Sequence, residues 1–244
     1  MTTATFIVIL LSPFLGALLQ CLSGFGAGVT FMVLLPYAFN VVQSATLSQT
    51  ICLILNIIAI GSIYKYVNKK VVIWQVVIYY PVYFICIQLS KTFDPNFFRP
   101  YLGIFFMALA IFCLITDEKV VLKANTPLLI ISGLLCGVFG AFFGAMGPII
   151  AIYMLAACKE KDEYIASLQM YFLLTNIFAM SVRIYARQLT MELVPYIAIG
   201  SVTLLLGYLV GRKISKKIKM KSIKRWAYVM VGVSGLITFL KCVL

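Results

Sequence analysis

The sequence predicts an all-α, polytopic integral membrane protein, and three observations support this fold class. Of the 244 residues, 63% are hydrophobic and only 11% are charged. The mean hydropathy of +1.06 is far from the balance of soluble globular domains. The stretches without charge are also longer than the roughly 10 residues of a membrane strand, and backbone groups cannot stay unpaired in lipid, so the spans must be helices.

Charge-free stretches mark the predicted membrane segments. Seven stretches contain no Asp, Glu, Lys or Arg: residues 1–64, 71–90, 100–116, 124–158, 164–182, 193–211 and 226–240. Five of them suit one span each, because a span takes about 20 residues. Residues 1–64 are long enough for about three segments, and residues 124–158 are too long for one. The chain must therefore double back, and we expect about 8 to 10 membrane segments in total.

An internal repeat relates the two over-long stretches. A displacement of 120 residues places Gly24 on Gly144, Gln49 on Gln169 and Asn56 on Asn176. Matched apolar residues are expected by chance in such a chain, but matched amides inside membrane segments are not. The sequence therefore predicts two transmembrane repeats, residues 1–116 and 127–244, joined by a polar linker at residues 117–126.

The distribution of basic residues decides how the over-long stretches cross the membrane. If each is one bent span, the 20 Lys and Arg divide 12 to 8 between the two sides. If each is a hairpin that returns to its own side, they divide 15 to 5, which agrees better with the positive-inside rule. The hairpins also make the two repeats insert with inverted topology, with both termini outside. Cytoplasmic loops are then expected near residues 65–70, 117–125, 159–163 and 212–225.

Glycine-rich motifs lie where these hairpins must turn. They read GFGAG at residues 24–28 and GVFGAFFGAMGP at residues 137–148. A helix that is interrupted inside the membrane leaves N–H groups facing a cavity, and these donors favour an anion. We expect Gly26, Gly28, Gly147 and Pro148 at such tips. A stripe with spacing 4-3-4-3 (Gly133, Gly137, Gly140, Gly144 and Gly147) also permits close helix packing, which we expect between the hairpin arms.

Amide side chains recur in both predicted repeats. Gln49 and Asn56 lie two turns apart on one helix face, about 10.5 Å along the axis, and Gln169 and Asn176 repeat this spacing. Such amides either bond neighbouring helices or bind solute, and their recurrence favours a site. The predicted substrate-binding residues are Gly26, Gly28, Gln49, Asn56, Gly147, Pro148, Gln169 and Asn176. Weaker candidates are Ser23, Thr30, Thr46, Ser48 and Thr175. Arg183 is expected to be an end-of-helix anchor, with a role in attracting anions as the alternative.

Residue usage argues against an enzyme. The chain has no His, and its seven acids lie in loops or at segment ends. No catalytic or metal-ligating set is recognisable, and the singly scattered cysteines suggest packing residues, so we expect no metal and no cofactor. The basic run RKISKKIKMKSIKR at residues 212–225 suits a cytoplasmic loop facing membrane lipid rather than a nucleic acid.

The two glycine motifs, each opening one half of a basic chain of this length, resemble the TauE/SafE family of sulfite and organosulfonate permeases, the TSUP transporters. The family pattern is nearer G-x-G-G-G-x-x-x-x-P, and this sequence has Ala27, Ala145 and Met146 where glycines are usual. The resemblance implies transport of a small anionic compound, such as sulfite, an organosulfonate, thiosulfate or a carboxylate. It also implies a multi-pass protein of a bacterial-type cytoplasmic cell membrane.

Two other functions stay open at this point. An anion channel for the same solutes would need the same donors, and a non-transporting membrane scaffold would use the glycine stripes for packing alone. The sequence also leaves open the substrate, the direction of transport and whether the chain forms a homo-oligomer.

Overall fold

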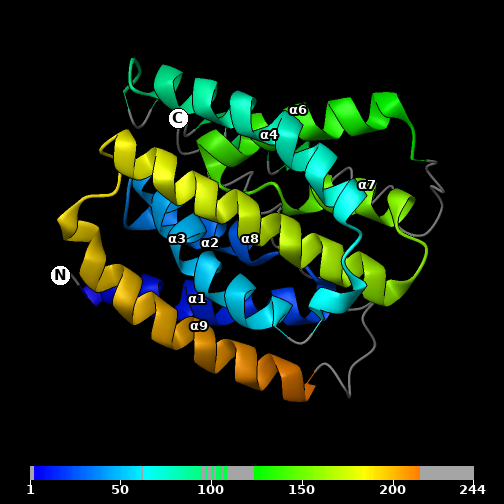
Figure 1. Cartoon of the computed structure of the whole chain (residues 1–244). Coiled ribbons are helices and arrows are strands. Elements are labelled where there is room, and N and C mark those ends of the chain that lie inside the picture. Colours follow the sequence, from blue (N-terminus) through cyan, green and yellow to red (C-terminus); the bar gives the residue numbers. More distant parts are fainter. Residues whose placement is uncertain are drawn as a thin grey trace.

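The computed structural model describes residues 3–61, 63–94, 97, 100–101, 103–105, 107–108 and 124–214. In these residues all regular secondary structure is helical (Figure 1), which confirms the predicted fold class. The α-helices are α1 (Thr3–Ser23), α2 (Ala27–Leu34), α3 (Val41–Ile60), α4 (Lys69–Ser90), α6 (Thr126–Phe143), α7 (Gly147–Ala157), α8 (Lys161–Tyr185) and α9 (Val194–Ile214). Most of the predicted linker and most of the basic run at 212–225 lie outside the described residues.

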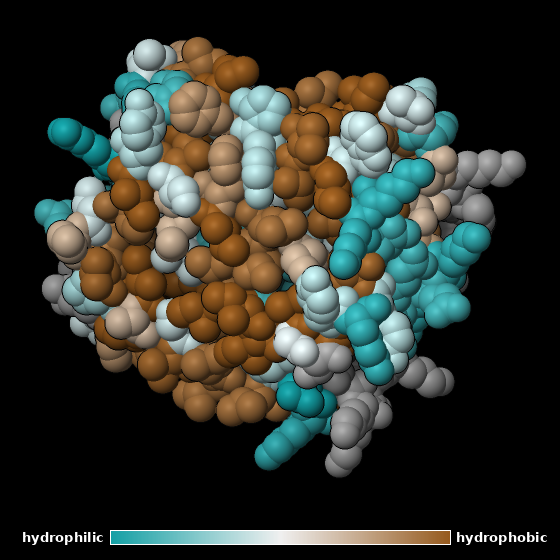
Figure 2. Space-filling model, viewed as in Figure 1, coloured by the Kyte–Doolittle hydropathy of each residue, from teal (hydrophilic) through white to brown (hydrophobic). Residues whose placement is uncertain are grey.

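Five of the described helices are long and apolar enough to cross a membrane: α3, α4, α6, α8 and the segment Met191–Ile214 that contains α9. Their outward faces expose large apolar side chains, such as Trp74 and Ile85 on α4 and Leu209 on α9. Figure 2 shows hydrophobic side chains over most of one face, with hydrophilic ones gathered toward its edges. This surface suits lipid and confirms a multi-pass membrane protein.

The helices pack side by side in pairs. Helix α1 lies along α9, α4 lies along α6, and α3 packs against α8 between these pairs (Figure 1). Helices α2 and α7 begin 120 residues apart, at Ala27 and Gly147, and α3 and α8 begin 120 residues apart, at Val41 and Lys161. This spacing equals the displacement that relates the predicted repeats. Their inverted membrane orientation stays a prediction.

Glycines break the chain at both predicted hairpins. Gly24 and Gly144 have φ of +79° and +60°, a left-handed conformation that residues with a Cβ rarely adopt. Beyond the first break α2 folds back on α1, because a Cβ built on Gly16 would lie 3.3 Å from the Ala27 Cα. In a continuous helix these two residues would be about 16 Å apart. The chain also folds back at the second break, since the Cys136 Sγ lies 4.0 Å from the Met146 carbonyl oxygen.

The glycine stripe on α6 packs, but against a different helix from the one expected. A Cβ on Gly133 would lie 2.7 Å from Ile78 Cγ2, and a Cβ on Gly137 would lie 2.6 Å from Val82 Cγ1. Both partners belong to α4, so the expected packing between the hairpin arms is wrong for this part of the stripe. The physical reason is length: α7 has only 11 residues and covers little of α6, which leaves the bare face to α4.

Candidate solute-binding site

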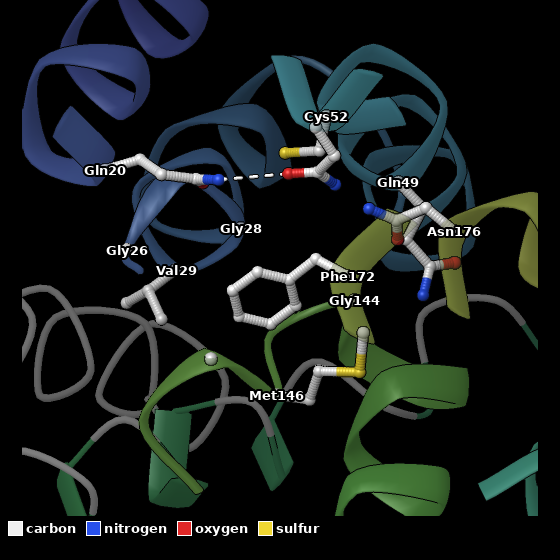
Figure 3. A pocket seen from close by; sticks show the side chains of 12 residues that line it. Gln20, Gly26, Gly28, Val29, Gln49, Cys52, Gly144, Met146, Phe172 and Asn176 are labelled. Atoms are coloured by element: carbon white, nitrogen blue, oxygen red, sulfur yellow. Dashed lines mark hydrogen bonds between the residues drawn. The ribbon is translucent and has the colours of Figure 1, made fainter. Parts of the chain in front are cut away.

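A pocket lies where the two hairpins meet α3 and α8. Figure 3 shows its wall, with the Phe172 ring and the Met146 side chain lying across from Gln20 and Cys52. The lining residues are Gln20, Gly26, Gly28, Val29, Gln49, Cys52, Asn56, Gly144, Met146, Gly147, Phe172 and Asn176. The pocket therefore joins segments from both predicted repeats.

The tips of the two hairpins touch each other in the pocket wall. A Cβ on Gly28 would lie 2.6 Å from the Gly144 carbonyl oxygen, and a Cβ on Gly147 would lie 3.7 Å from the Gly26 backbone nitrogen. Helices α2 and α7 both begin here, and neither first turn has a side-chain cap. The first turn of a helix has N–H groups without an intrahelical partner and the positive end of the helix dipole. The tips thus bring two sets of donors to one place.

Gln20 organises the amides on one side of the pocket. Its Nε2 donates to Asn56 Oδ1 at 3.1 Å and to Gln169 Oε1 at 3.2 Å, and Gln169 Nε2 donates to the Gly24 carbonyl at 2.9 Å. Asn56 is 1% exposed, and its Nδ2 has no hydrogen-bond partner among the described residues. The Gln20 contact occupies the acceptor of Asn56 and leaves its donor free.

Gln49 lines the pocket, but its polar atoms bond to the surrounding helices. Its Nε2 donates to the Gly140 carbonyl at 2.9 Å, and its Oε1 accepts from the Tyr83 hydroxyl and from Arg183 Nε, both at 2.8 Å. The side chain therefore connects α3 with α4, α6 and α8. It contributes shape and rigidity to the pocket rather than a free hydrogen-bonding group.

Arg183 is buried, and its predicted role as an end-of-helix anchor is wrong. The side chain is 1% exposed. Besides Gln49 it donates to Thr46 Oγ1 at 3.1 Å, to Gln188 Oε1 at 2.7 Å and to the Ala141 carbonyl at 2.8 Å. The reason is the packing of α8 against α3 and α4, which turns the face that carries Arg183 inward instead of toward the membrane interface.

The structure places most of the predicted site residues in one wall. Those that line the pocket are Gly26, Gly28, Gln49, Asn56, Gly147 and Asn176. Gln169 lies behind the wall and is hydrogen-bonded to Gln20. Pro148 is buried at the start of α7 and has no N–H to offer. No hydrogen bond of the Asn176 side chain is found among the described residues, so its amide is available.

The weaker candidates contribute less. The hydroxyls of Thr30, Thr46 and Thr175 bond to carbonyls of their own helices. The Ser48 hydroxyl lies 3.7 Å from the Cβ position of Gly28. The Ser23 side chain lies outside the described residues.

Sequence reasoning missed Gln20, the residue that orients Asn56. The only feature of the sequence that marks Gln20 is its polar side chain within an apolar stretch, four residues before the GFGAG motif. The displacement of 120 residues matches it with Gly140, so the repeat gave no hint of an amide here. The repeat also could not reveal Phe172 and Cys52, which are apolar parts of the wall.

Hydrogen bonds around the pocket engage several carbonyl acceptors and leave the Asn56 Nδ2 donor without a partner among the described residues. The carbonyls at the C-terminal ends of α1 and α6, where a helix dipole is negative, bond to side-chain donors: Gly24 to Gln169, Gly140 to Gln49, and Ala141 to Arg183. Carbonyls engaged in this way are poor ligands for a cation. The described residues also contain no cluster of His, Cys, Asp or Glu that could hold a metal ion. The available groups include the Asn56 Nδ2 donor, the Asn176 amide and the N-termini of α2 and α7, and such donors suit an anion.

A comparison with protein families finds one described as Sulfite exporter TauE/SafE, whose model matches residues 9–238. No curated protein and no solved structure matches the chain. The family match covers nearly the whole sequence, including both hairpins and every residue of the pocket. The chain therefore belongs to the sulfite exporter TauE/SafE family of membrane transporters.

Proposed function

We propose that the protein is a permease for a small oxyanion, such as sulfite, an organosulfonate, thiosulfate or a carboxylate, in the cytoplasmic membrane. Its binding site is the pocket between the hairpin tips. The observation that supports this most directly is the unpartnered Nδ2 of Asn56, buried beside the uncapped starts of α2 and α7. A buried donor without a partner costs about 1–3 kcal/mol. A bound oxyanion offers acceptors to this group and to the N–H groups of both tips.

The same donors argue for an anion rather than for Na⁺. A sodium ion needs several oxygen ligands, but the carbonyls of Gly24, Gly140 and Ala141 already accept hydrogen bonds from side chains. The oxygen of Asn56 is likewise occupied by Gln20. An anion needs none of these bonds to break.

The contact between the tips favours a carrier over a channel. The predicted repeats would rock against each other around the pocket, in the manner of transporters built from inverted repeats. A continuous pore would need Gly28 and Gly144 to stand apart, whereas they are in close contact. A non-transporting scaffold would gain nothing from a free buried amide.

Thermal unfolding of the purified protein with a panel of salts tests the proposed site. Sodium salts of sulfite, methanesulfonate, thiosulfate and acetate are compared at fixed ionic strength, because a ligand that binds the folded state raises Tm by mass action. At least one anion is expected to raise Tm in a saturable way. Exchange of Na⁺ for K⁺ or choline with the same anion should leave Tm unchanged. A saturable shift that follows the cation and not the anion would contradict the proposal.

A further inference from the structure

Arg183 is a fully buried cation whose hydrogen-bond partners are all neutral. Its four hydrogen bonds go to the side chains of Gln49, Thr46 and Gln188 and to the Ala141 carbonyl. None of the carboxylates in the described part of the chain pairs with it; Glu163, for example, bonds to Asn68 and to the Lys159 backbone. A guanidinium keeps its charge under all physiological conditions. Among the residues that the structure describes, the Arg183 charge in the interior therefore has no carboxylate that neutralises it.

A buried charge of this kind lowers the stability of the folded protein, so its presence in the interior needs an explanation. Taking a charge out of water is unfavourable unless a counter-charge compensates it, and ionisable groups inside membrane proteins commonly mark solute pathways. Neutral amides could connect the same helices at lower cost, as Gln20 does on the other side of the pocket. The lack of a counter-charge within the described part of the chain points to a bound anion as the transient partner of this charge.

The position of Arg183 links it to the pocket. Its Nε bonds to the oxygen of Gln49, and Gln49 lines the pocket (Figure 3). The guanidinium thus lies one side chain behind the wall. On its other side it bonds to Gln188, which is half-buried and donates to Ser90 Oγ at 3.0 Å. A chain of polar groups therefore runs from the ends of α4 and α8 to the pocket.

We propose that Arg183 is the charge-selecting residue of the transporter: its unneutralised guanidinium sets a positive potential in the pocket and makes it prefer dianions to monoanions. This inference rests on the proposed anion site and adds its specificity. Arg183 acts through space and through Gln49, without touching the solute, so it is a positioning and selecting residue. For scale, two unit charges separated by about 8 Å at an effective dielectric constant of about 20 interact with an energy that changes the affinity for a monoanion roughly thirtyfold. The effect on a dianion is the square of that factor.

The ratio of two affinities separates this role from a structural one. Binding of thiosulfate, a dianion, and of methanesulfonate, a monoanion, is measured by calorimetry on the purified protein at constant ionic strength. General damage to the pocket lowers both affinities together, whereas loss of the charge lowers their ratio. Arg183→Gln removes the charge, and Arg183→Lys keeps it. Gln188→Glu leaves Arg183 in place and neutralises it, because a carboxylate oxygen can accept the bond that Gln188 Oε1 now accepts.

Asn125→Asp is the matched control. It adds the same negative charge and keeps an oxygen for the N-cap bond to the Leu128 backbone. Its position is the N-terminus of α6, about 27 Å along that helix from the break.

The expected result is a thiosulfate-to-methanesulfonate affinity ratio at least tenfold lower in Arg183→Gln and Gln188→Glu than in the natural protein. Arg183→Lys and Asn125→Asp should keep the ratio within about threefold. If Arg183→Gln does not accumulate, Gln188→Glu decides alone. An unchanged ratio in Gln188→Glu, with anion binding retained, would overturn the role of Arg183. Absence of anion binding in the natural protein would instead overturn the proposed function.

Discussion

Gln20 and Asn56 are joined by a hydrogen bond of 3.1 Å from Nε2 to Oδ1, between helices α1 and α3. This bond fixes which end of the Asn56 amide is free. Because the oxygen is held by Gln20, the Nδ2 group remains without a partner beside the hairpin tips. One neutral side chain thus leaves the Asn56 amide with a free donor rather than a free acceptor.

Alanine at the two hairpin glycines should have unequal effects. In Gly28→Ala the new Cβ would lie 2.6 Å from the Gly144 carbonyl oxygen, a backbone atom that cannot move cheaply. In Gly147→Ala the nearest atom is Phe25 Cβ at 3.3 Å, which a small shift can relieve. We expect Gly28→Ala to lose about 2–3 kcal/mol of stability and most transport, and Gly147→Ala to lose less than about 1 kcal/mol. Thermal unfolding and flux on both variants check this order, and equal losses would contradict the tip-to-tip contact.

Leucine at Gln49 and at Asn176 should separate a structural amide from a binding amide. Gln49→Leu removes three hydrogen bonds and leaves the Arg183 Nε unpaired in the interior. We expect a loss of about 3–5 kcal/mol and poor accumulation in the membrane. Asn176→Leu breaks no hydrogen bond among the described residues, so it should fold normally and transport more slowly. Size-exclusion profiles and transport rates test this pair, and a misfolded Asn176→Leu would assign that amide to helix packing.

The expected energy coupling follows from the lack of Asp, Glu and His in the central parts of the predicted membrane segments. A proton-coupled carrier normally uses Asp, Glu or His within a membrane helix. This sequence has no His, and its acids lie at segment ends or in loops. We expect transport down the electrochemical gradient of the substrate, for which an inside-negative potential favours anion export by about 2.3 kcal/mol per charge per 100 mV.

Proteoliposomes with one imposed gradient at a time test this expectation. The solute is a strong-acid sulfonate, which cannot carry a proton itself. An inside-positive potential should drive its uptake, and a pH or Na⁺ gradient at zero potential should not. Concentrative uptake driven by the pH gradient alone would reveal a proton site, and uptake driven by Na⁺ would show that carbonyls at the broken helices do bind a cation.

The membrane topology is tested by labelling single cysteines in a background without the native ones. Tyr37 and Lys69 are both exposed, at the end of the first hairpin and at the start of α4. The hairpin arrangement places Tyr37 outside and Lys69 inside. An impermeant thiol reagent added to intact cells should therefore label Tyr37→Cys and not Lys69→Cys. The opposite pattern would overturn the predicted inverted repeats.

The breaks in the membrane helices could be predicted from sequence because they depend on local chemistry. Glycine at positions 24 and 144 permits the left-handed backbone, and the length of the charge-free stretches requires the chain to return. The amides Asn56 and Asn176 were found for a similar reason, since a period of seven places them on the same face as Gln49 and Gln169.

The environment of Arg183 could not be predicted in this way. Arg183 follows directly after a charge-free stretch, which is typical of an interface anchor. Its burial depends on Thr46 and Ala141, which are 137 and 42 residues away in the chain. Gln20 was missed for the same physical reason, because its partners Asn56 and Gln169 belong to two other helices. Side-chain contacts between distant helices leave no periodic pattern in the sequence.

The most direct test of the anion site is counterflow of a labelled organosulfonate into proteoliposomes, with Asn56→Asp as the critical variant. The aspartate keeps an oxygen for the Gln20 bond and replaces the free Nδ2 donor with a negatively charged acceptor. Asn125→Asp, which adds the same charge at the α6 N-cap, is the control. We expect counterflow with the natural protein and with Asn125→Asp, and a loss of at least tenfold with a folded Asn56→Asp. Undiminished counterflow in Asn56→Asp would show that the anion does not bind in this pocket.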